Sequence, residues 1–235
     1  MNHLFCQFSV PIVVLLASLH SFPAAAESTC GCEDIPDIRN RLCITRAAIA
    51  EYDRLIQRAR DQEKQTGKPI FVTKSDKENL IKPCVQEVMV AMNVPGSRQA
   101  KAETDDACDV TVTRADTACL GKAVEIHEGR HALVCQWMRE KESSRGLIAE
   151  FLMNFKDTRS GQSAIGYMNE EKSGYQGEIN FLRSELMSLS ARCPRGMFEI
   201  ETKDPSGNTR REFTIEFCPP PKPRPPVDKS ACQAR

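Results

Sequence analysis

The number and placement of cysteines constrain the fold of this chain more than any other feature. An apolar run at residues 10–19 is followed by Ala24-Ala25-Ala26, so residues 1–26 are predicted to be a signal peptide cleaved after Ala26. The run is too short to span a bilayer. Cleavage removes Cys6 and leaves ten of the eleven cysteines. An even number in an exported chain predicts a disulfide framework and an extracytoplasmic location, secreted or periplasmic.

Helix geometry excludes one pairing among the ten mature cysteines. They are Cys30, Cys32, Cys43, Cys84, Cys108, Cys119, Cys135, Cys193, Cys218 and Cys232. Cys119 and Cys135 fall on one predicted helix and lie about 24 Å apart along it, at a rise of about 1.5 Å per residue. A disulfide needs Cα atoms within about 7 Å of each other. Each of these two cysteines must therefore pair elsewhere, and the other pairings stay open.

The charge pattern argues against two classes of partner. The formal net charge is zero, with 32 basic and 32 acidic residues, and the two signs are interspersed along the chain. Proteins that bind nucleic acids or anionic membranes electrostatically concentrate basic residues instead. We therefore expect no nucleic acid partner, and no membrane association after signal cleavage. The sequence leaves the oligomeric state open.

Apolar residues spaced three or four apart predict a mainly α-helical domain over residues 27–192. The expected helices cover residues 36–65, 75–93, 116–142, 146–155 and 163–191. Pro83 should kink or delay the second of these helices, because proline lacks the backbone N–H of a helix interior. Residues 97–115 are interpreted as a polar loop with a short strand at 109–113.

The C-terminal part, residues 193–235, has a different pattern. Apolar and polar residues alternate at 198–201 and 213–217 on either side of a turn-forming segment, which predicts a β-hairpin with a long turn. Residues 219–226 are rich in proline and should be extended. The chain is thus expected to be a helical, disulfide-stapled domain with a small C-terminal β-hairpin.

The segment His127-Glu128-Gly129-Arg130-His131 is an H-E-x-x-H motif in the middle of the predicted helix 116–142. Residues four apart lie on one helix face, so the two imidazoles can bind one Zn²⁺ and the glutamate can reach a water on it. The motif contains both histidines that remain after signal cleavage. Both belong to a stripe predicted to face the core, which consists of Leu120, Val124, His127, His131, Cys135 and Met138.

This motif resembles that of the zincin metallopeptidases. The run Glu171-Lys172-Ser173-Gly174-Tyr175 is similar to the E-x-x-A-Y segment that supplies the glutamate ligand in gluzincins, with Gly174 in place of alanine. The resemblance covers the motif and its helix, and no zincin-type sheet is evident before it. It implies a zinc metallopeptidase that acts on a peptide or protein substrate.

The resemblance also implies a role for each residue of the motif. His127 and His131 would bind Zn²⁺, with Glu171 as the third ligand. Glu128 would act as general base on the zinc-bound water and then pass the proton to the leaving amine. Tyr175 is a candidate for stabilising the oxyanion.

Three glutamates are candidates for the third protein ligand that a catalytic zinc needs. Glu171 lies within, and Glu178 at the edge of, the apolar stripe of helix 163–191, where a carboxylate is costly unless it is paired or bound to metal. Glu150 lies 19 residues after His131, a spacing found in one large aminopeptidase family. It points away from the apolar face of its own predicted helix, however. We therefore favour Glu171, which requires helix 116–142 to pack on helix 163–191.

Two other interpretations remain. Cys135 lies one turn beyond His131 and would complete a closed, structural metal site with both histidines, although a disulfide is its commoner state in an oxidising compartment. If no metal binds, the chain is a non-catalytic, disulfide-rich binding protein. A free thiol at Cys135 favours the first alternative, and solvent-facing histidines without a nearby carboxylate favour the second.

Overall fold

The computed structural model describes residues 29–143, 162–204 and 206–218, and over this part the chain is mainly α-helical. The long helices are α1 (Ile35–Thr66), α4 (Ala118–Ser143) and α6 (Ala164–Arg192). They confirm the predicted helices 36–65, 116–142 and 163–191. The Ser163 hydroxyl begins α6 by accepting a hydrogen bond of 3.3 Å from the Gly166 N–H. The predicted helix 146–155 lies outside the described residues.

The helix predicted at 75–93 is interrupted, as Pro83 requires. It consists of α2 (Lys74–Asp76), a π-helical segment η2 (Lys77–Ile81) and α3 (Lys82–Met92). Pro83 falls in the first turn of α3, where its missing N–H is tolerated. The wider π turn before it replaces the regular hydrogen bonds that proline would break.

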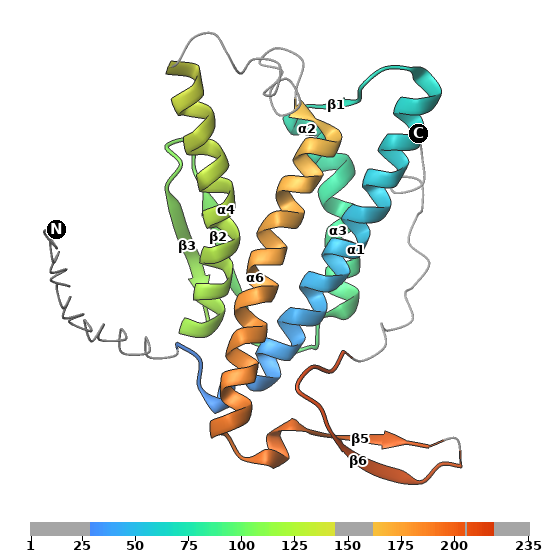
Figure 1. Ribbon diagram of the computed structural model, residues 1–235, viewed down its shortest axis with the longest axis vertical. Helices are drawn as coiled ribbons and strands as arrows, with labels where there is room; N and C mark the ends of the chain where they lie inside the picture. The colour runs from blue at the N-terminus through green and yellow to red at the C-terminus, as the bar shows by residue number, and fades with distance from the viewer. Residues whose placement is uncertain (1–28, 144–161, 205, 219–235) are drawn as a thin grey trace, which may run out of the picture.

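Helix α6 lies in the middle of the molecule, between α4 on one side and α1 on the other, and α3 packs along α1 (Figure 1). A first apolar cluster joins α1, α4 and α6, and its Ile38, Leu182, Leu186 and Leu189 are fully buried. A second cluster joins α1, α3 and the first turns of α6. The periodic apolar stripes that predict the helices thus meet along α6, which is the axis of the core.

One strand, within residues 97–115, is not predicted from the sequence. β2 (Ala100–Thr104) pairs antiparallel with β3 (Val110–Ala115), and the hairpin packs against α4. The strand predicted at 109–113 is confirmed, but its partner strand lies in the segment interpreted as a polar loop. β2 alternates half-buried and exposed residues. A strand that buries so little apolar surface gives only a weak pattern in the sequence.

The predicted C-terminal hairpin is present, but its second strand is shifted. β5 (Glu199–Lys203) pairs with β6 (Thr209–Phe213). The observed second strand therefore ends at Phe213, the residue at which the predicted strand 213–217 begins. The alternation at 213–217 has another cause, because this segment docks on α1. Arg39 donates hydrogen bonds to the carbonyl oxygens of Thr214 and Ile215, and Ile215 packs against the first apolar cluster.

A further short sheet pairs β1 (Phe71–Val72) with β4 (Gln162–Ser163) ahead of α6. Disulfides then tie the helices and hairpins together. Within the described residues they are Cys30–Cys119, Cys32–Cys193, Cys43–Cys218 and Cys108–Cys135. The first of them joins the start of the described chain to α4, and Cys108–Cys135 joins the β2–β3 hairpin to the same helix. The predicted exclusion of a Cys119–Cys135 bond is confirmed.

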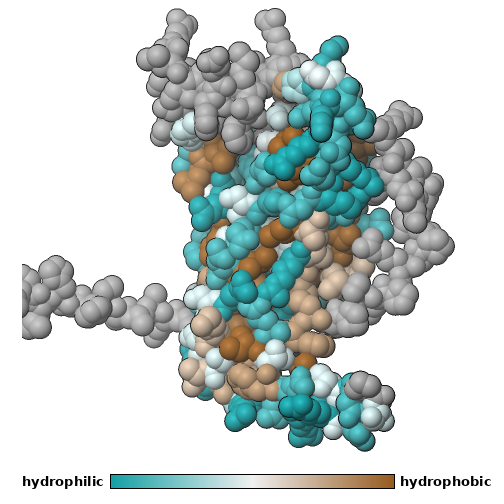
Figure 2. Space-filling model, turned by 45° about the vertical axis from the view of Figure 1, so that its right-hand side comes forward, coloured by the Kyte–Doolittle hydropathy of each residue, from teal (hydrophilic) through white to brown (hydrophobic). Residues whose placement is uncertain are grey.

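The surface mixes polar and apolar residues. On the face drawn in Figure 2, polar residues predominate toward the top of the molecule, and apolar residues are more frequent in its middle and lower parts, toward the β5–β6 hairpin. None of the described helices combines the length and apolar character needed to cross a bilayer.

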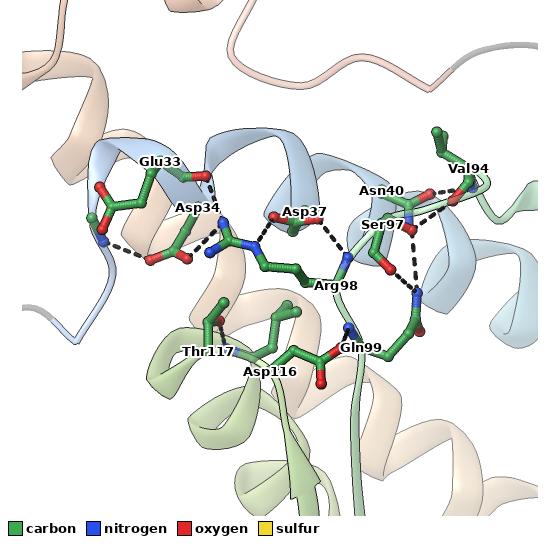
Figure 3. Close-up of polar contacts among 12 residues, drawn as sticks. Glu33, Asp34, Asp37, Asn40, Val94, Ser97, Arg98, Gln99, Asp116 and Thr117 are labelled. Atoms are coloured by element: carbon green, nitrogen blue, oxygen red, sulfur yellow. Dashed lines mark hydrogen bonds and ion pairs between the residues drawn. The ribbon is translucent and has the colours of Figure 1, made fainter.

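A polar network links the start of α1 to the segment before β2 (Figure 3). Arg98 pairs with Asp37, at 2.7 Å between Nε and Oδ2, and with Asp34, at 3.1 Å between Nη2 and Oδ1. Both carboxylates are buried, and the Arg98 guanidinium also donates to the Glu33 carbonyl oxygen. Arg98 therefore neutralises two carboxylates that the fold has withdrawn from water.

Replacing Arg98 with methionine should lower the free energy of unfolding by about 1–3 kcal/mol, because two buried carboxylates lose their cation. Because the Arg98 side chain is 37% exposed, this is less than the loss for a fully buried pair. Urea unfolding of the oxidised protein measures the change. Arg114→Met, which breaks an exposed pair with Asp116, is the control and should change stability little. Equal effects of the two variants would contradict a special role for Arg98.

Candidate metal centre

Two glycines of α6 bring this helix close to α4. A Cβ atom built on Gly174 would lie 2.9 Å from Nε2 and 3.0 Å from Cδ2 of His127. A Cβ atom on Gly177 would lie 3.3 Å from the Ile126 Cγ2 atom. The missing side chain at position 174 leaves the space that the His127 ring occupies. The glycine that departs from the gluzincin pattern thus has a steric reason in this fold.

The structure brings together the three residues predicted to hold a metal. Nε2 of His127 and Nε2 of His131 lie 3.3 Å apart, and Oε2 of Glu171 lies 3.9 Å and 3.8 Å from them. A triangle with these sides has a circumscribed radius of about 2.1 Å, which matches Zn–N and Zn–O bond lengths of about 2.0–2.2 Å. These residues form a group of ligand atoms that could hold one metal ion.

The outer nitrogens of both imidazoles face carboxylates. Nδ1 of His131 lies 2.9 Å from Oε1 of Glu170, and Nδ1 of His127 lies 3.6 Å from Oε2 of Glu178. A carboxylate beside Nδ1 favours the tautomer with its proton there, so that Nε2 carries a lone pair. Two Nε2 lone pairs then face each other beside the Glu171 carboxylate. This arrangement repels itself unless a proton on one Nε2 or a metal ion lies between these atoms.

The charges around His131 also favour a cation. Burial by itself lowers the pKa of His131, but the hydrogen bond with Glu170 and the negative charges of Glu171 and Glu170 reverse the shift and raise it. The site thus attracts positive charge, whether as a proton on the imidazole or as a metal ion.

Glu178 is fully buried and belongs to the surroundings of His127 rather than to the inner group. Both of its oxygens pair with the Arg41 guanidinium of α1, one of them at 3.1 Å from Nη2. Burial raises the pKa of the Glu178 carboxyl, but Arg41 and His127 together outweigh burial and hold this pKa below its ordinary value. Glu178, a sequence candidate for the third ligand, thus faces Nδ1 of His127, and Glu171 takes the inner position beside Nε2.

The Glu128 carboxylate lies on the side of α4 that faces the β2–β3 hairpin. The Thr104 hydroxyl of β2 lies 3.0 Å from Oε2 of Glu128 and 3.0 Å from its carbonyl oxygen. The missed strand β2 therefore contributes a contact to the motif. The role of Glu128 as general base stays a prediction.

All three tyrosines of the chain lie near Glu171. Burial and then the negative charge of Glu171 raise the pKa of Tyr52, Tyr167 and Tyr175. The Tyr175 ring packs edge-on against His127, with ring centroids 4.3 Å apart, and its hydroxyl lies 3.6 Å from Sδ of Met89. The tyrosines thus stay neutral beside this partly buried carboxylate. The oxyanion role of Tyr175 stays a prediction.

The remaining sequence candidates fall outside the group. Cys135 forms a disulfide with Cys108, so it offers no thiolate, and the structural site with Cys135 is wrong. Glu150 lies outside the described residues. Sequence reasoning missed Arg41, Thr104 and Glu170. Arg41 lies on α1 and Thr104 on β2, and no pattern in the sequence links either residue to the motif on α4. Glu170 is adjacent to the candidate ligand Glu171, and this position could have marked it as a residue of the site.

A pocket of about 300 Å³ opens between α4 and α6 beside the metal group. It is lined by Arg130, Leu133, Val134, Asn169, Glu170 and Ser173. Glu170 connects this pocket to the site, because the same side chain contacts Nδ1 of His131.

Comparisons with known proteins give no independent indication of function. No protein-family model matches the chain, and neither a curated protein nor a solved structure matches it.

Proposed function

We propose that this protein is an exported zinc-dependent hydrolase that cleaves peptide bonds. The observation that carries the proposal is the arrangement of His127, His131 and Glu171, whose facing atoms are spaced for one ion. Two imidazoles and one carboxylate are the ligand set of many catalytic zinc sites, which leave a further position open. Zinc fits these nitrogen and oxygen donors better than Ca²⁺ or Mg²⁺, which prefer oxygen ligands alone.

A bound zinc ion supplies a water molecule of lowered pKa and polarises a substrate carbonyl. The chain supplies the remaining groups. Oε1 of Glu128 is the atom to which we assign the proton taken from water, while Thr104 holds Oε2. Glu171 is only 16% exposed and lies beside neutral tyrosines, and in such partly buried surroundings charges interact more strongly than in water. A peptide can approach along the pocket that Glu170 borders.

The disulfides support the compartment in which such an enzyme would act. Disulfide-rich chains are stable in oxidising, extracytoplasmic surroundings. Together with the signal sequence expected at residues 1–26, they support export to the periplasm or beyond the cell.

A non-catalytic metal centre is the second candidate. It is favoured by the contact between Thr104 and Glu128, which engages the motif glutamate in a structural hydrogen bond. The metal would then stiffen the α4–α6 pair in place of activating water.

Metal analysis and a peptide-library cleavage assay on the oxidised mature protein test both candidates. We expect one zinc per chain in the wild type and in Glu128→Gln, with cleavage only in the wild type. Glu125→Gln is the control, because Glu125 lies on the same helix in an exposed pair with Lys122 and should keep full activity. Zinc without cleavage in the wild type would support the non-catalytic centre. A wild type that binds no zinc when it is supplied in excess would overturn both candidates.

A further inference from the structure

Arg41 and Glu178 form a buried ion pair behind the metal group. Glu178 is 0% exposed, and the Arg41 side chain is 15% exposed. Arg41 donates from Nε to Oε1 and from Nη2 to Oε2, so the guanidinium makes a bidentate contact with the Glu178 carboxylate. A two-point contact of this kind fixes the plane of the carboxylate as well as its charge.

The carboxylate fixed in this way faces the outer nitrogen of His127. Nδ1 of His127 is buried and makes no hydrogen bond within 3.5 Å to any described residue. Oε2 of Glu178 lies 3.6 Å from it, just beyond that limit. A buried N–H favours an orientation toward an anion, so the proton of the neutral ring belongs on Nδ1. The lone pair of Nε2 then points toward His131 and Glu171.

We propose that Arg41 is a positioning residue of the metal centre, which acts through Glu178 to fix the tautomer and orientation of His127. This inference rests on the metal centre proposed above. Arg41 lies on α1 and touches neither His131 nor Glu171 among the contacts of the described residues. Three helices therefore build the site: α4 and α6 provide the ligands, and α1 sets the direction in which one of them points.

Two measurements on the oxidised mature protein test this role. The first is zinc affinity, from competition with a chromogenic chelator. The second is the nitrogen NMR spectrum of protein with ¹⁵N-labelled histidine, which is readable because the mature chain has only two histidines. The tautomer of His127 is measured without metal, so the second readout does not depend on zinc binding.

We expect the wild type to carry the His127 proton on Nδ1. Arg41→Met should mix the tautomers and weaken zinc binding 10- to 100-fold, as is typical when an outer partner of a ligating histidine is removed. Arg41→Lys should lose less zinc affinity than Arg41→Met, because lysine keeps the positive charge although it cannot make the bidentate contact with Glu178. Arg46→Met is the control, since Arg46 also lies on α1 and pairs with a glutamate, Glu216, away from the site.

The outcomes separate this inference from the proposed function. If Arg41→Met keeps both the wild-type tautomer and the wild-type affinity, the positioning role is overturned. If Arg41→Met does not fold, Glu178→Gln gives the same test, and an unchanged tautomer and affinity in that variant overturns the role. A wild type that binds no zinc defeats the metal centre, while the tautomer measurement still reports whether Arg41 orients His127.

Discussion

Gly174→Ala is expected to weaken zinc binding by about a hundredfold or more, a loss of roughly 2.8 kcal/mol in binding free energy. The added Cβ would lie 2.9 Å from Nε2 of His127, closer than carbon and nitrogen atoms approach without displacement. The ring also packs edge-on against Tyr175, so we expect it to yield by turning Nε2 away from His131 and Glu171. Chelator competition measures the affinity.

The matched control for this substitution is Gly129→Ala, inside the H-E-x-x-H motif itself. A Cβ on Gly129 meets no atom within 4 Å, so the variant should bind zinc as the wild type does. It should also gain up to about 1 kcal/mol of stability, because alanine favours a helix interior over glycine. If Gly174→Ala also binds zinc normally, the site does not depend on the close approach of α6 to His127.

Glu171→Gln should reduce zinc affinity by about a thousandfold, well beyond the 10- to 100-fold loss expected for an outer partner. The amide keeps the size of the carboxylate but removes the charge that faces the two Nε2 atoms at 3.9 Å and 3.8 Å. Zinc stoichiometry and affinity, with near-ultraviolet circular dichroism to confirm the fold, measure the effect.

The zinc affinity of a variant at the adjacent residue, Glu170→Gln, is the comparison for Glu171→Gln. Glu170→Gln removes a carboxylate that lies next in the sequence but contacts Nδ1 of His131 at 2.9 Å, on the outer side of the ring. We expect this variant to lose only 10- to 100-fold in affinity, because the ligand set stays intact. Equal losses in the two variants, or a larger loss in Glu170→Gln, would contradict the assignment of Glu171 as the inner ligand.

Much of the fold follows from local patterns in the sequence. The apolar periodicity of α1, α4 and α6 is strong because each helix buries one continuous face. Pro83 predicted the interruption before α3 from the chemistry of a single residue. Strand β2 was not predicted because its half-buried residues give only a weak alternation of apolar and polar residues. Strand β6 was predicted too late in the chain because apolar and polar residues also alternate at 213–217, where the segment contacts α1.

The candidate site could be predicted only where it depends on residues within one helix. A spacing of four on a helix places His127 and His131 together wherever that helix lies, so the pair is a local property. The choice among glutamates was not local. Glu171 and Glu178 both border the apolar stripe of α6, and only the placement of α4 and α1 assigns one to Nε2 and the other to Nδ1 and Arg41.

The sequence by itself determined the long helices α1, α4 and α6, the paired histidines, and the impossibility of a Cys119–Cys135 bond, since each depends on geometry within one segment. The tertiary structure alone decided the cysteine pairings among the described residues, the space that Gly174 leaves for His127, the position of the tyrosines near Glu171, and the contact of Arg41 with Glu178 across 137 residues of chain. These features are contacts between segments, and no local preference specifies which distant side chain completes them.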